Sequence, residues 1–374
     1  TRARVTGADA LAEQTVSGRW DIWGSSLDLL ATRPALGVGP SGFLDAYPAV
    51  QSATAAATSD PWGALDAPHA WPLQAAMAGG LPLLALALVL AWLVVTRLLR
   101  GARSARGVGA GSGPDLLILG ATGAVLGHGV GLLTHPTAAG TAVVAVLAGL
   151  GLAVPSRRGP LRGSAGPLGD RVLRTTTDGR ALRAVRVWAA VLAVALGLAI
   201  CGERAMEVAS VHAASGAVAP AERAFSTARV LRPWDPDVPL IAALTFRGGA
   251  LAGDPASAGA AQRWALEGLR RTPTSTELHL ALGAAQLTLG RVPEAVTTLD
   301  AAAQLAPQNA MVHLLLGVAL ARDGSVAPAE DHLLIATAHP ATARDAWAGL
   351  AVLYARTGRE EAAADATARA GAAG

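Results

Sequence analysis

The chain has 374 residues, of which 52% are hydrophobic and only 15% are charged, whereas about a quarter of the residues of a soluble domain are charged. The mean hydropathy of +0.40 and the isoelectric point near 9.9 come from apolar runs between residues 73 and 201 and from arginines clustered beside them. Basic clusters beside apolar runs are typical of the positive-inside rule for membrane proteins, so the composition argues against a nucleic-acid partner.

Residues 1–72 are polar and carry short motifs that lead into the first apolar run. In chain order these motifs are a Gly-Arg pair followed by a Trp, a Pro followed by G-x-G-x-x-x-F, a His with Leu-Gln four residues on, and a Gly pair. Their residues are Gly18, Arg19, Trp23, Pro34, Gly37, Gly39, Phe43, His69, Leu73, Gln74, Gly79 and Gly80.

This order of motifs resembles the large extracytoplasmic loop of the O-antigen ligase / O-antigen polymerase family. The likeness covers roughly residues 15–95. In that family Asn or Ser more often follows the His, where this chain has Ala70. The resemblance implies a membrane glycosyltransferase that moves a glycan from undecaprenyl pyrophosphate to an acceptor hydroxyl outside the membrane, without a metal or other cofactor.

The resemblance points to three candidate site residues. Arg19 is the first candidate and Arg33 the second for binding the pyrophosphate, because a guanidinium makes bidentate contacts with phosphate oxygens. His69 is the candidate general base, because imidazole is partly neutral near pH 7. The candidate catalytic residues are therefore His69 and Arg19.

Each of these residues also has an ordinary structural explanation. Arg19 could pair with Asp21 or Asp28 or contact lipid phosphates, and Arg33 could be a surface or headgroup arginine. His69 could cap the membrane helix that follows it. A hydrolase would need two carboxylates across the scissile bond, and the spacing of the aspartates in this loop singles out no pair.

Four apolar runs follow, at residues 73–95, 116–133, 138–154 and 187–201. The first exceeds the roughly 20 residues that cross a bilayer core. The last is short, but Arg186 could extend it by snorkelling; a buried soluble helix is the alternative there. The single cysteine, Cys201, ends this run and can form no internal disulfide.

The arginines predict the orientation of these runs. Basic loops at 97–115 and 155–186 are expected in the cytoplasm. Residues 1–72 and 202–374 then lie outside the cell, in a multi-pass protein of the plasma membrane. Because the chain opens in polar sequence without a signal peptide, we expect upstream membrane spans, and without them residues 1–374 could be inactive.

The C-terminal part repeats with a period near 34 residues. Gly290, Gly324 and Gly358 recur at this spacing, and Leu282-Gly283 is matched by Leu316-Gly317. The last unit has Trp, Leu, Ala and Tyr at the spacing of the W-x2-L-G-x2-Y consensus of tetratricopeptide (TPR) repeats. Weaker helical pairs are predicted at residues 212–236 and 237–273. The scattered histidines are expected to be packing or surface residues.

The sequence therefore predicts an all-α protein with about four transmembrane helices in residues 73–201 and a TPR-type α-solenoid in residues 202–374. The leading hypothesis is the membrane glycosyltransferase, with a groove in the repeats that binds a protein or glycan partner. Another kind of multi-span glycosyltransferase, which uses lipid-phosphate sugars, remains open. The non-enzymatic alternative is a membrane-anchored TPR scaffold of a cell-envelope assembly, and a bare spacer remains possible for the repeats.

Overall fold

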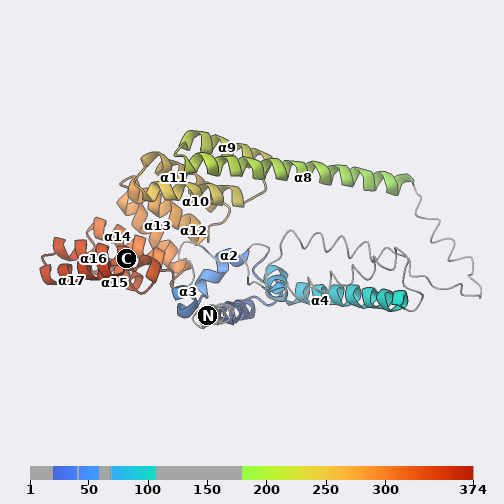
Figure 1. The fold of residues 1–374 in the computed structure, drawn as a ribbon, viewed down its shortest axis with the longest axis horizontal. Coiled ribbons are helices and arrows are strands. Elements are labelled where there is room, and N and C mark those ends of the chain that lie inside the picture. The colour runs from blue at the N-terminus through green and yellow to red at the C-terminus, as the bar shows by residue number, and fades with distance from the viewer. Residues whose placement is uncertain (1–19, 40–41, 59–67, 69, 107–178, 374) are drawn as a thin grey trace, which may run out of the picture. The chain divides into compact units, whose positions relative to one another are not determined.

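The computed structural model describes residues 20–39, 42–58, 68, 70–106 and 179–373 (Figure 1). Described elements are helical, and no strand occurs among these residues, which confirms the all-α prediction for this part of the chain. The chain divides into two compact units, one made of residues 1–156 and 272–374 and the other of residues 157–271.

The N-terminal residues form short helices followed by one long helix. Residues 20–32 are helical, and the later elements are α2 (Gly42–Ala46), η1 (Tyr47–Ala49), α3 (Ala53–Thr58) and α4 (Trp71–Arg106). A small apolar core joins the first helical residues, α2, η1 and the start of α4. It consists of Leu29, Leu30, Phe43, Tyr47, Ala76 and Met77.

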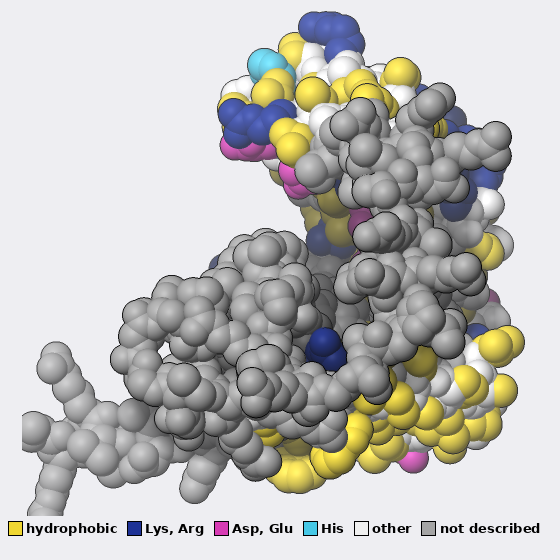
Figure 2. All heavy atoms as spheres, turned by 90° about the vertical axis from the view of Figure 1, so that its right-hand side faces the viewer, with side chains coloured by type: hydrophobic (Ala, Val, Ile, Leu, Met, Phe, Trp, Pro, Cys, Tyr) yellow, Lys and Arg dark blue, Asp and Glu magenta, His cyan; other side chains and the backbone are white. Residues whose placement is uncertain are grey.

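Beyond this core, α4 exposes its apolar side chains. The segment Trp71–Arg97 is the one helix, among the residues described, that is long and apolar enough to cross a membrane, and only 6% of its most apolar window is buried. Trp92 is 69% exposed and Leu93 56%. Figure 2 shows hydrophobic side chains gathered low on the face it presents, at the height of α4 in Figure 1. By length and composition alone, such a helix could cross a bilayer core.

Of the other three predicted spans, the structure describes only the last. The runs 116–133 and 138–154 lie outside the described residues, as does most of the basic loop 155–186. The run 187–201 falls within helix α8 (Gly179–Ala214), whose backbone is helical throughout. Helix α8 passes through the predicted domain boundary at 201/202, and α4 continues as far as Arg106 into the predicted basic loop 97–115.

Three antiparallel helical pairs form the C-terminal part. They are α12 (Thr276–Thr288) with α13 (Val292–Leu305), α14 (Ala310–Asp323) with α15 (Val326–Ala336), and α16 (Pro340–Arg356) with α17 (Glu360–Ala372). Asn309 caps the start of α14 by accepting from the backbone N–H groups of Met311 and Val312, and Gly324 ends it with a left-handed φ of 94°. The period of 34 residues thus corresponds to one helix–turn–helix unit.

Two further pairs form the unit of residues 157–271. They are α8 with α9 (Val218–Leu231), and α10 (Asp237–Leu251) with α11 (Pro255–Leu269). Phe225 packs edge-to-face against Phe246 and Trp264, with ring centroids 5.8 and 6.0 Å apart, so three helices share one aromatic core. The predicted pairs at 212–236 and 237–273 are confirmed as helical, with the first pair beginning inside α8.

Candidate functional site

The motifs around Pro34 and the Gly79-Gly80 pair meet in the structure. Helix α4 is interrupted there, with non-helical backbone at Gly79 and Gly80. The interruption leaves the carbonyl of Met77 free to accept the backbone N–H groups of Val38 at 2.7 Å and Gly39 at 3.1 Å. The backbone N–H of Leu81 donates to the carbonyl of Pro34 at 2.8 Å. The segment 34–39 therefore completes the hydrogen bonds that the broken helix lacks.

Two glycines make this close approach possible. Gly37 has a φ of +63°, and a Cβ there would lie 2.3 Å from the carbonyl oxygen of Met77. Gly80 has a φ of +69°, and a Cβ there would lie 2.5 Å from the backbone of Ala35. Both positions combine a left-handed conformation with backbone in contact, which only glycine accommodates.

Neighbouring contacts hold this region together. The indole Nε1 of Trp23 donates to the carbonyl of Pro68 at 2.9 Å, and the rings of Phe43 and Tyr47 stack with centroids 5.1 Å apart. Burial, helped by the negative charge of Asp21, raises the pKa of Tyr47 to about 12, so its hydroxyl stays protonated. The roles of Pro68 and Met77 depend on their backbone carbonyls, which no sequence motif signals.

Only one of the three predicted site residues, Arg33, lies in the described part of the chain. Arg19 and His69 lie outside the described residues, although Pro68 and Ala70, on either side of His69, are both buried. Arg33 is exposed, and its carbonyl accepts the backbone N–H of Gly37 at 2.9 Å. Among the described residues, no group of three or more His, Cys, Asp or Glu is arranged to hold a metal ion.

In the repeats, the Leu-Gly pairs have a packing role. A Cβ at Gly283 would lie 2.5 Å from the side chain of Leu299, and one at Gly317 would lie 2.7 Å from that of Leu333. Each glycine thus lets the second helix of its pair approach the first. Leu299 and Leu333 are fully buried, so these contacts form the core of each unit.

The first helices of the last two pairs carry a repeated pattern of a valine and an arginine. Val318 and Arg322 lie four residues apart on α14, and Val352 and Arg356 occupy the equivalent positions on α16, so each pair shares one helix face. The guanidinium of Arg322 donates to the carbonyl of Leu287 at 3.1 Å, and that of Arg356 to the carbonyl of Ala321 at 2.8 Å. Each guanidinium has further N–H donors besides the one used in this bond.

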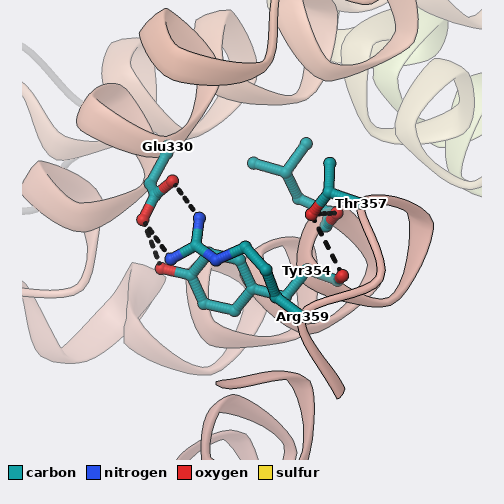
Figure 3. Close-up of polar contacts among 5 residues, drawn as sticks. Glu330, Tyr354, Thr357 and Arg359 are labelled. Carbon is teal, nitrogen blue, oxygen red and sulfur yellow. Dashed lines mark hydrogen bonds and ion pairs between the residues drawn. The ribbon is translucent and has the colours of Figure 1, made fainter. Parts of the chain in front are cut away.

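A polar cluster joins α15 to the last helical pair (Figure 3). The carboxylate of Glu330 accepts two hydrogen bonds from the guanidinium of Arg359, at 2.6 and 3.1 Å, and one from the hydroxyl of Tyr354 at 2.8 Å. The guanidinium also lies over the Tyr354 ring, 4.1 Å from its centroid. The hydrogen bond from Arg359, above all, holds the pKa of Glu330 below its ordinary value of 4.5.

This cluster predicts an acid sensitivity of the last repeat. Because the pKa of Glu330 is lower in the folded state, its contribution is present above the unfolded value and is lost as the pH falls through the folded value. Replacing Glu330 by Gln should flatten the pH dependence of thermal unfolding between roughly pH 5 and pH 3. Circular dichroism melts would test this, with Glu294→Gln on the exposed surface of α13 as control. An unchanged slope in Glu330→Gln would contradict it.

Two histidines pair inside the middle repeat. The Nδ1 atoms of His313 and His332 are 2.8 Å apart, and the Nε2 of His313 lies 2.9 Å from the carbonyl of Pro307. A carbonyl only accepts, so in the neutral pair the Nε2 of His313 donates to Pro307 and the Nδ1 of His332 donates to His313. Burial first, and the nearby His313 second, lower the pKa of His332, while Asp300 and Asp331 partly oppose them.

The pair predicts a second, separate pH effect. A depressed pKa means that His332 contributes stability above its unfolded value of about 6.5 and that this contribution is lost as the pH falls. Replacing His332 by Phe should remove the loss of thermal stability between roughly pH 7 and pH 5. His212→Gln on α8, which replaces a histidine outside the pair, is the control. A His332→Phe protein with the parent's slope in this range would contradict this role of His332.

Comparisons with known proteins concern the repeats. The chain is similar to the crystal structure of TTC0263, a thermophilic TPR protein in Thermus thermophilus, with 24% identity, coverage of 45% of this chain and 89% of that one, and a TM-score of 0.36. It is also similar to a mutant of MamA, with 22% identity, coverage of 47% and 98%, and the same TM-score of 0.36. No protein-family model and no curated protein matches the chain. The C-terminal helical pairs are TPR-type repeats by their own period, turn glycines and packing.

Proposed function

We propose that this chain is a membrane-anchored TPR scaffold that holds a partner protein beside the bilayer. The observation that carries this proposal is a helix with exposed apolar side chains, Trp71–Arg97, in the same chain as stacked TPR-type helical pairs. Stacked repeats of this kind present an extended surface to partners. An anchor and a binding surface are together sufficient for a scaffold, and neither requires a catalytic residue.

The pattern of valine and arginine on α14 and α16 suggests the chemistry of the partner. Val352 is 61% exposed, and Arg356 lies on the same helix face one turn further on. An arginine that donates once to a carbonyl keeps donors for a carboxylate. The partner segment would therefore present apolar side chains interleaved with acidic ones.

Site-specific cross-linking in membranes would test the scaffold. A photoreactive residue at Val352 should cross-link a discrete partner, whereas one at Thr297, exposed on the second helix α13, should not. Reversing both charges, with Arg322→Glu and Arg356→Glu, should abolish the product at position 352. Equal cross-linking from positions 352 and 297 would show that this face is not the binding surface.

The topology belongs to the same proposal. Residues 1–72 and the repeats would lie outside the cell, in a multi-pass protein of the plasma membrane, with the basic loops inside. A cysteine introduced at exposed Thr297, in a Cys201→Ser background, should react with an impermeant thiol reagent on intact cells. Labelling only after lysis would put the repeats in the cytoplasm and overturn this orientation.

A second candidate function is glycan transfer outside the membrane. It is favoured by the meeting of Pro34 and Gly37 with the Gly79-Gly80 break, since these motif elements carry the resemblance to O-antigen ligases and polymerases. In this function His69 would act as general base, while Arg19 and Arg33 would bind an undecaprenyl pyrophosphate donor. The donor, the bilayer and an acceptor at the repeats would then be the partners.

An activity assay separates the two functions. A protein that includes any upstream spans would be supplied with a lipid-pyrophosphate-linked glycan, and transfer to an acceptor would be followed on gels. Under the second function, His69→Ala should lower the rate by about 10²–10⁴-fold with no loss of folded protein. If the parent protein transfers no glycan but cross-links specifically at Val352, glycan transfer is excluded and the scaffold function remains.

A further inference from the structure

Helix α8 has two parts that join without a break. Its first part contains the apolar residues 187–201, and its second part packs in the first helical pair. Residues 187–201 carry no charge and are followed by Gly202 and Glu203. Among their described side chains, Val187, Val194 and Ile200 are more than half exposed, at 62, 63 and 55%. One turn later the same helix is packed, because Met206 and Ala209 are buried. A single helix thus passes from an exposed apolar segment into the core of a repeat.

Arg232, at the end of α9, fixes this junction. Its side chain lies against Gly202, where an added Cβ would be 2.4 Å from the Arg232 Cδ. Its guanidinium donates to Glu203 at 2.8 Å and pairs with the buried Asp235. Asp235 in turn accepts the backbone N–H of Asp237, the first residue of α10, at 2.9 Å. One arginine therefore ties α8 to the end of α9 and the start of α10.

These contacts set the level of the α9–α10 turn along α8. The backbone N–H of Asp235 donates to the carbonyl of Arg232 at 3.1 Å, which closes a tight turn around Trp234. Because Arg232 contacts Gly202, this turn lies one residue beyond the end of the apolar segment. Trp234 is 61% exposed and Val230, four residues earlier, is 78% exposed. Large apolar side chains are thus exposed beside the place where α8 changes from apolar to packed.

We infer that the α9–α10 turn contacts the lipid bilayer and that Trp234 lies in the headgroup region beside α8. This inference rests on the proposed multi-pass topology, since residues 187–201 must cross the bilayer for the turn to meet its surface. Tryptophan favours the interface because its ring is apolar while its N–H can still hydrogen-bond to water or headgroups. The Arg232 contacts would then hold the first repeat at a fixed height above the membrane.

Single-cysteine labelling tests the inference, because Cys201 is the only cysteine in the chain. In a Cys201→Ser background, one cysteine is placed by Trp234→Cys, Val194→Cys or Ser215→Cys, and an environment-sensitive fluorophore is attached. Ser215 follows α8, about 20 Å from Gly202 along the helix axis. The full chain is reconstituted in nanodiscs containing phospholipids spin-labelled near the headgroup. Quenching at 234 should be at least about threefold stronger than at 215, and Arg232→Gln should reduce it.

The outcomes distinguish failure of this inference from failure of the proposed membrane topology. The fluorophore at 194 should be shielded from aqueous iodide; if iodide reaches it freely, residues 187–201 do not cross the bilayer and the proposed multi-pass topology fails. If 194 is shielded but 234 is quenched no more by lipid than 215, the α8 span stands and the contact of the turn with lipid is overturned. Shielding of 234 from iodide without quenching by lipid would mean that protein covers the turn, which also overturns the inference.

Discussion

Replacing Gly37 by Ala should detach the segment 34–39 from the broken helix α4. The left-handed φ alone costs an alanine about 1–2 kcal/mol, and the Cβ would lie 2.3 Å from the Met77 carbonyl oxygen. Because backbone rather than a flexible side chain must yield, a further cost of about 1–3 kcal/mol is expected. Hydrogen exchange of the full-length protein in nanodiscs should show faster exchange at the amides of Val38 and Leu81.

Gly39 is the matched control for this substitution. Its φ of +92° is also left-handed, but a Cβ there would meet nothing within 4 Å. Gly39→Ala should therefore cost only the backbone term, and its exchange should lie between that of the parent and that of Gly37→Ala. Equal exchange in the two variants would mean that the close approach of Gly37 to α4 does not hold the segment.

Replacing Leu333 by Ala should destabilise the repeats by about 2–5 kcal/mol. Leu333 is fully buried and fills the space between Gly317 on α14 and Gly349 on α16. Truncation leaves a cavity that two helix backbones line, so little can collapse into it. Urea unfolding followed by circular dichroism would measure the loss. The neighbouring Leu334 is 41% exposed, and Leu334→Ala should change the stability by no more than about 0.5 kcal/mol.

A second substitution checks that the cavity is the cause. A Cβ at Gly317 would lie 2.7 Å from the Leu333 Cγ, so Gly317→Ala alone should overpack this contact and destabilise the repeats. In the Leu333→Ala background the same methyl group has room. The double variant should therefore lose less stability than the sum of the losses in the two single variants. Strict additivity of the two effects would contradict a shared packing site.

The scaffold and the glycan-transfer function use different ends of the described chain. The scaffold depends on the repeat face that carries Val352 and Arg356, whereas transfer would depend on the N-terminal loop that contains His69. The Gly37 and Leu333 variants perturb these ends separately. A partner cross-link that survives Gly37→Ala and is lost with Leu333→Ala would assign binding to the repeats.

The helical pairs of the C-terminal part can be predicted from the sequence alone. Gly290, Gly324 and Gly358 end one helix and begin the next at a fixed period, and each adopts a positive φ. These features are local, because a turn glycine and an apolar stripe act within one repeat and are then repeated along the chain. The apolar character of α4 is readable for the same reason, since it depends only on consecutive residues.

Which distant groups meet depends on the folded structure. The motifs around Gly37 and Gly80 are visible in the sequence. The need for glycine there comes from a backbone contact between segments about 40 residues apart. The bonds of Glu330 to Arg359 and of His313 to His332 likewise join different helices. The path of α8 across residues 201 and 202 is a further case: hydrophobicity changes there while the helix continues, and the Arg232 side chain lies against Gly202. Such contacts depend on how the helices pack in space, which the order of residues does not display.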